Sequence, residues 1–103
     1  MIYVIATLEL APGTRGAFLA EFAKVVPLVH AEAGCIEYAP AVDAETDIPS
    51  QHRMGPDRVT IVEKWENVDR LRAHDTAPHM QAYRGRVKDY VRGKEIRILK
   101  AAA

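Results

Sequence analysis

Two histidines have the side chains best suited to proton transfer in this sequence. His74 and His79 flank the break between two predicted helices, and histidine exchanges protons readily near neutral pH. Their spacing of five residues differs from the i, i+4 spacing with which one helical face binds a metal ion, so we expect no metal site. For either residue, a surface or helix-capping role is the alternative.

Glu63 and Trp65 share one face of a predicted strand, the face expected to point toward the helices. A carboxylate there is costly unless it is paired, so Glu63 either binds an arginine or marks a polar pocket. Trp65, at the end of the strand, either fills the core or forms the wall of a cleft and stacks on a planar ligand. Tyr38 and Tyr83 either offer hydroxyl groups to this pocket or are half-buried core residues.

The first half of the chain is predicted to supply a strand, a helix and a second strand. Residues 2–10 are apolar and β-branched and predict a buried strand. Thr14 is expected to cap a helix through its hydroxyl, Pro27 to kink that helix and Gly34 to end it. The helix carries a single apolar stripe, Phe18, Phe22, Val25, Val26 and Val29. Residues 35–42 form the second strand.

The second half is predicted to hold the elements that carry Glu63, Trp65 and both histidines. A polar loop spans residues 43–57, in which residues 50–54 could pair as a short strand, and residues 59–66 form a strand. Asn67 caps a short helix that runs through His74, and Pro78 starts another helix that Gly93 ends. The last strand is residues 95–99.

This order of elements, β-α-β-(β)-β-α-β, predicts the split βαβ plan of an α+β, ferredoxin-like fold in one domain, residues 1–103. The helices cover only one face of the antiparallel sheet. The other face carries Tyr3, Ile5, Val62 and Leu99, which are too apolar to leave in water. We therefore expect a homodimer whose sheets pack face to face.

Composition excludes several classes of protein. Fourteen Lys and Arg residues balance fourteen Asp and Glu residues, which gives no reason to expect nucleic acid or an acidic membrane as partner. The cluster Arg84, Arg86, Lys88 and Arg92 is interpreted as a solvated helix face. A lone cysteine, Cys35, fits a reducing, cytoplasmic compartment, and the first ten residues resemble neither a signal peptide nor a membrane span.

Known catalytic motifs are absent: there is no phosphate-binding glycine loop, nucleophile elbow or HExxH. Three segments, however, resemble the antibiotic biosynthesis monooxygenase family, and most of all its small bacterial quinol monooxygenases. They are FAKVVPLVHAEAGCIEYAPAVD, VEKWENVDRLRAHDTAPHMQAY and the ending IRIL. The most specific pieces are the Gly34-Cys35 junction, Trp65 with Glu66, and the stretch that carries His74, Pro78, His79 and Met80.

The resemblance implies a dimeric enzyme that oxidises quinols or polyphenols with O₂ and uses no metal, flavin or haem. A deprotonated, electron-rich ring would pass one electron to O₂, and the radical pair would recombine. Trp65 would orient the ring, with Tyr38, Tyr83 and Ile61 around it. His74, ranked first, or His79 or Glu63 would be the base.

Two departures from the family narrow these implications. Members that make polyketide antibiotics carry an asparagine where this chain has Ile61, which argues against an asparagine-assisted mechanism. The residues used by the haem-degrading branch correspond roughly to Ala6, His74 and Arg84, so haem degradation is disfavoured. The second hypothesis is a non-catalytic, dimeric module that binds a small aromatic molecule.

Overall fold

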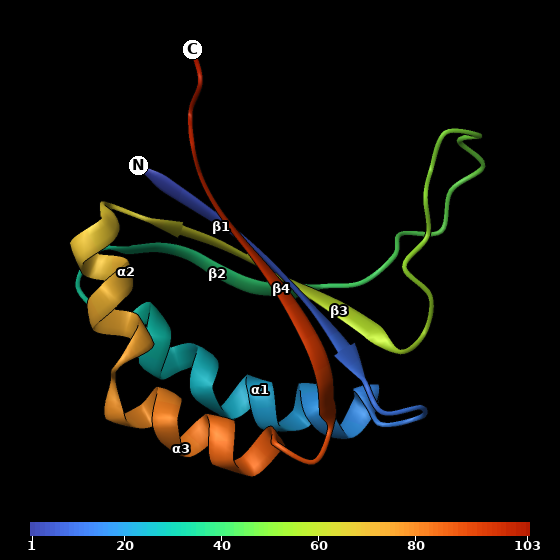
Figure 1. Cartoon of the computed structure of the whole chain (residues 1–103), viewed down its shortest axis with the longest axis horizontal. Helices are drawn as coiled ribbons and strands as arrows, with labels where there is room; N and C mark the ends of the chain where they lie inside the picture. Colours follow the sequence, from blue (N-terminus) through green and yellow to red (C-terminus); the bar gives the residue numbers. More distant parts are fainter.

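A computed structural model describes all 103 residues as one antiparallel sheet with three helices on one of its faces (Figure 1). In chain order the elements are β1 (Ile2–Leu10), α1 (Arg15–His30), β2 (Cys35–Ala41), β3 (Arg58–Trp65), α2 (Val68–Asp75), α3 (Pro78–Val87) and β4 (Val91–Lys100). The strand order is β2-β3-β1-β4. This is the ferredoxin-like arrangement that the order of elements predicted.

The core lies between the sheet and the helices. Alternate residues of β3, namely Val59, Ile61, Glu63 and Trp65, are buried on the face that the helices cover, as the period of two predicted. Phe18, Phe22, Val25 and Val29 of α1 pack against this face. The stripe read from the sequence is confirmed except at Val26, which is only partly buried.

The ends of α1 differ from the prediction. The Thr14 hydroxyl donates to the carbonyl of Ala11, at 2.7 Å, and caps no amide, so the predicted side-chain cap is wrong. The helix continues through Pro27 but ends at His30, four residues before Gly34. Gly34 does adopt a positive φ of 82°, and there it ends the turn that leads into β2.

The boundary between α3 and β4 also differs. The helix ends at Val87 and the last strand begins at Val91, so Gly93 lies inside a strand instead of ending the helix. Val91 pairs with Leu10 of β1, and a bulge follows in the register. Pairing with β1 therefore places residues 91–93 in the strand and not in the preceding helix.

The polar loop between β2 and β3 projects from one end of the sheet (Figure 1). Residues 50–54 form no strand, so that expectation is wrong. The Asp43 carboxylate instead accepts hydrogen bonds from the backbone N–H groups of Met54 and Gly55, at 3.0 and 2.9 Å. These two bonds lower the pKa of Asp43 and close the base of the loop.

Candidate active site

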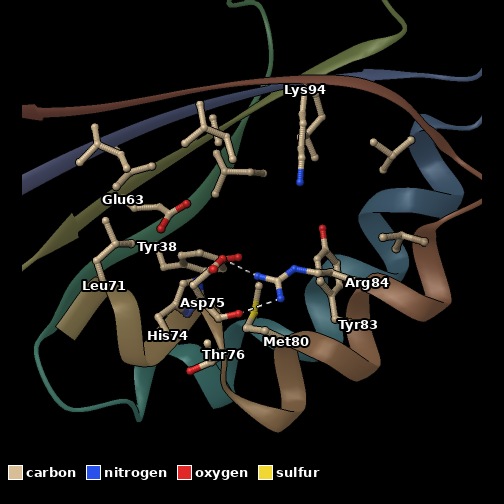
Figure 2. Close-up of a pocket in the computed structure, with 18 of the residues that line it drawn as sticks. Tyr38, Glu63, Leu71, His74, Asp75, Thr76, Met80, Tyr83, Arg84 and Lys94 are labelled. Atoms are coloured by element: carbon tan, nitrogen blue, oxygen red, sulfur yellow. Dashed lines mark hydrogen bonds and ion pairs between the residues drawn. The ribbon is translucent and has the colours of Figure 1, made fainter. Parts of the chain in front are cut away.

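A cavity of about 960 Å³ opens between the sheet and helices α2 and α3. Its walls come from the helix-facing residues of β1, β3 and β4 and from α2, α3 and Tyr38 of β2 (Figure 2). Thirteen of its 23 lining residues are hydrophobic. An apolar, largely preformed space of this size suits a small aromatic molecule.

His74 forms part of the cavity wall, and its imidazole is hydrogen-bonded to Glu32. The two residues lie 42 positions apart, and the Nδ1 atom of His74 is 2.8 Å from Oε2 of Glu32. The Nε2 atom of His79 is 2.9 Å from the same oxygen. An ionised carboxylate can only accept, so both ring N–H groups donate to it.

The donation from Nδ1 leaves Nε2 as the free nitrogen of the His74 ring. The only hydrogen bond of the His74 side chain is the one to Glu32. Every fully buried side-chain nitrogen or oxygen of the protein has a hydrogen-bond partner, so Nε2, which has none, is not fully buried. His74 is also one of the residues that line the cavity.

Aromatic rings hold the imidazole of His74 in place. The Trp65 ring centroid lies 4.6 Å from that of His74, and the Tyr38 ring meets it edge-on at 5.3 Å. His74 is 5% exposed. The histidine that was ranked first from the sequence is thus a fixed part of the cavity wall, whereas His79 lies outside the lining and reaches only Glu32.

Glu63 lines the cavity, as His74 does, and its carboxylate faces into it (Figure 2). Its carboxylate accepts a hydrogen bond of 2.9 Å from the indole N–H of Trp65, and no arginine pairs with it. Burial raises its pKa, and the Trp65 donor and nearby His74 offset only part of that effect. Of the two alternatives posed by the sequence, the contacts favour a polar position in a pocket.

Trp65 is fully buried and is not part of the cavity lining. Its indole contacts His74 through the ring and Glu63 through Nε1. In this conformation the ring is covered by protein on the side where a ligand was expected to stack.

Tyr38, Tyr83 and Ile61 do line the cavity. Burial raises the pKa of both tyrosines above the ordinary value of 10, so their phenols remain protonated and are able to donate a hydrogen bond. Ile61, which pairs with Ala6 of β1, adds an apolar part to the cavity wall.

Sequence reasoning missed Glu32, which follows the end of α1. Its side chain is 12% exposed and accepts from two histidines that come more than forty residues later. The available signal was a carboxylate in the turn between a helix and a strand. That position does not reveal which residues it meets.

The side chains of His, Cys, Asp and Glu form no group of three or more that could hold a metal ion. No helix combines the length and apolar character needed to cross a membrane.

Fold and site together define a class. A family model described as antibiotic biosynthesis monooxygenase matches residues 1–86, most of the chain. The chain belongs to this family, and it is accordingly a monooxygenase, an oxidoreductase.

A protein of known sequence agrees with this assignment, and two solved structures share the fold. The chain is 45% identical over 101 residues, 96% of both chains, to a protein of Escherichia coli K12 described as "probable quinol monooxygenase YgiN". A solved structure described as an antibiotic biosynthesis monooxygenase superposes with a TM-score of 0.82 at 19% identity and covers all of both chains. Protein SO0527 from Shewanella oneidensis gives a TM-score of 0.79 at 27% identity, over 95% of this chain and 87% of that one.

Proposed function

We propose that this protein oxidises a quinol or polyphenol with O₂, without a cofactor, and that His74 is the base. The observation that carries the proposal is the arrangement of His74: Nδ1 is held by Glu32 at 2.8 Å, Nε2 has no hydrogen-bond partner, and the residue lines the cavity. A carboxylate behind an imidazole fixes its tautomer and stabilises the cation that forms on proton uptake. The relative described as a probable quinol monooxygenase supports the choice of substrate class.

The reaction balances without any added reductant. His74 Nε2 accepts a proton from a ring hydroxyl, and the electron-rich anion passes one electron to O₂. Recombination of the two radicals forms a C–O bond and gives a hydroperoxide of the ring. Loss of water then leaves a hydroxyquinone, so that quinol and O₂ yield hydroxyquinone and one water. The substrate supplies both electrons that reduce the second oxygen atom.

The other cavity residues bind and orient in this scheme. The phenols of Tyr38 and Tyr83 donate hydrogen bonds to substrate oxygens, while Ile61 and its apolar neighbours hold the ring and admit O₂. Glu63, whose pKa is raised by burial, is a second proton carrier beside the ring. Trp65 does not contact the substrate and instead positions Glu63 and His74 through its hydrogen bond to the one and its ring contact with the other. His79 stabilises the Glu32 carboxylate and takes no proton from the substrate.

We also propose that the protein is a homodimer formed through the free face of the sheet. Tyr3, Ile5 and Val62 remain half-exposed there, and Leu99 is 47% exposed beside them. Thr7 and Thr60 bond to each other across this face, with their hydroxyls 3.1 Å apart. An apolar strip on a sheet face is favourably buried against a second copy.

Oxygen labelling tests the activity. With a naphthoquinol as substrate and ¹⁸O₂ as oxidant, we expect one labelled atom in the product and one in water. The rate should exceed autoxidation and be unchanged by a chelator. A protein that binds the quinol but leaves O₂ uptake at the background rate would be the aromatic-binding module instead.

A further inference from the structure

The cavity wall is rich in positive charge although the chain as a whole is neutral. Five cationic side chains, Arg72, Arg84, Lys88, Arg92 and Lys94, line it against only two carboxylates, Glu63 and Asp75. The whole sequence has fourteen of each sign. The excess of cations is therefore local to this cavity.

Two of these cations are already paired. Arg84 donates to the Asp75 carboxylate and to the Asp75 backbone carbonyl, at 2.8 Å each. Arg72 lies 3.5 Å from Asp69. Lys88, Arg92 and Lys94 form no ion pair within 4.0 Å, although all three line the same cavity.

Lys94 is the best placed of the unpaired cations. It pairs with Leu8 in the β1–β4 register, which places it on the helix-facing side of the sheet, and its amine points into the cavity on the side of Arg84 (Figure 2). Ile96 and Ile98 follow on the same face and line the cavity. An ammonium group at the end of an apolar wall attracts an anion.

Lys94 and Glu63 lie in different rows of the sheet that lines the cavity. Val4 pairs with Glu63 on one side and Ile98 on the other, whereas Leu8 pairs with Val59 and Lys94. The rows of Glu63 and Lys94 are therefore four residues apart along β1, about 13 Å at 3.3 Å per residue. A ligand whose ring lies at His74 and Glu63, and which extends along β1 toward Leu8, brings its other end toward Lys94.

From this arrangement we infer that the substrate is an acidic quinol: a hydroxylated aromatic that carries a carboxylate, which Lys94 binds. Lys88 and Arg92 add to the positive potential at the same end. This inference rests on the proposed function, because it places the reacting ring beside His74. It adds a specificity-determining residue and a charged substituent to that function.

Two matched quinols test it. The probes are 1,4-dihydroxy-2-naphthoate and 1,4-dihydroxy-2-naphthamide, which have nearly the same shape and differ in charge. For the protein as purified we expect kcat/KM to favour the naphthoate, with a preference that shrinks at high salt. Lys94→Gln should lower kcat/KM for the naphthoate about five- to tenfold, mostly through KM, and leave the naphthamide unchanged.

Two further variants serve as controls. Lys94→Arg keeps the charge and should retain most of the preference. Lys100→Gln removes an exposed cation from the same strand but outside the cavity lining, and should change neither probe. Equal rates for the two probes with the unmodified protein, or an equal loss on both probes in Lys94→Gln, would overturn the inference.

Binding measurements with unreactive ligands distinguish a failure of this inference from a failure of the proposed function. The unreactive pair 2-naphthoate and 2-naphthamide is titrated by calorimetry into the protein and into Lys94→Gln. If neither quinol is oxidised but 2-naphthoate binds more tightly and loses that advantage in Lys94→Gln, the oxidation fails while the anion site stands. If both quinols are oxidised and the affinities are equal, the anion site fails while the proposed function stands.

Discussion

At the residue scale, one carboxylate organises the site. Glu32 accepts from His74 and His79 through a single oxygen, so the imidazole on the cavity wall is held by a residue that lies outside the cavity lining. Glu63, 7% exposed, adds a second titratable group to the same wall. Two titratable groups of different type and environment on one cavity wall are suited to proton transfer in both directions.

The raised pKa of Glu63 predicts a pH dependence of stability. As the pH rises above the ordinary carboxyl value of 4.5, the unfolded chain loses this proton before the folded chain does. Ionisation of Glu63 therefore lowers the free energy of unfolding as the pH rises from that value through the folded-state pKa. One pKa unit corresponds to about 1.4 kcal/mol.

Glu63→Gln should remove this loss while still accepting from the indole of Trp65. Denaturant unfolding from pH 4 to 8 should show the variant gaining stability relative to the unmodified protein as the pH rises. Glu66→Gln, an exposed neighbour, is the control and should follow the unmodified protein. A difference between Glu63→Gln and the unmodified protein that does not change with pH would contradict the assignment.

At the element scale, the junction between α1 and β2 positions both Glu32 and the strand that carries Tyr38. Gly34 has a φ of 82°, and its carbonyl accepts from the N–H of Glu66 at 2.9 Å. A Cβ added at Gly34 would lie 2.7 Å from Cβ of Arg70, an atom that cannot swing away. Both the backbone conformation and the close approach of α2 therefore require glycine here.

Gly34→Ala should destabilise the protein by about 1–3 kcal/mol. Gly85→Ala is the matched control, because it lies in α3 with no atom within 4 Å of its added Cβ. That substitution should be neutral or stabilise by about 0.5–1 kcal/mol. Thermal unfolding measures both, and an equal effect of the two substitutions would show that the junction imposes no special constraint.

The same elements show what sequence alone could predict. Strand periodicity placed Glu63, Trp65 and Ile61 on the buried face, because a period of two is a local property. The contact of Glu32 with His74 spans 42 residues, and nothing local predicts it. Lys94 was missed because Gly93 was read as the end of a helix, whereas pairing with β1 extends the strand back to Val91.

At the scale of the whole molecule, the two faces of the sheet have different tasks. One face carries the core and the cavity. Ile96 and Ile98 of β4 line that cavity and remain exposed. The other carries the half-exposed Tyr3, Ile5 and Val62 that we propose to be the dimer interface. A lysine in the middle of that second face should therefore weaken association without reaching the cavity.

Val62→Lys should shift the protein from dimer to monomer at micromolar concentration, because it places a charge in an apolar contact. Leu28→Lys is the control: Leu28 is 51% exposed on α1, away from the sheet, and the variant should remain dimeric. Sedimentation velocity distinguishes the 11.5 kDa monomer from a dimer. A folded monomer formed by the unmodified protein would contradict the proposed interface.

The most direct test of the account is the rate of quinol oxidation in His74→Ala compared with His79→Ala. Both substitutions remove one histidine from Glu32, but only His74 lines the cavity. We predict that His74→Ala lowers kcat by about 10²–10⁴, the usual effect of losing a general base, and that added imidazole restores part of the rate. His79→Ala should stay within a few-fold of the unmodified protein. A His74→Ala variant that turns over at the normal rate would contradict the central claim.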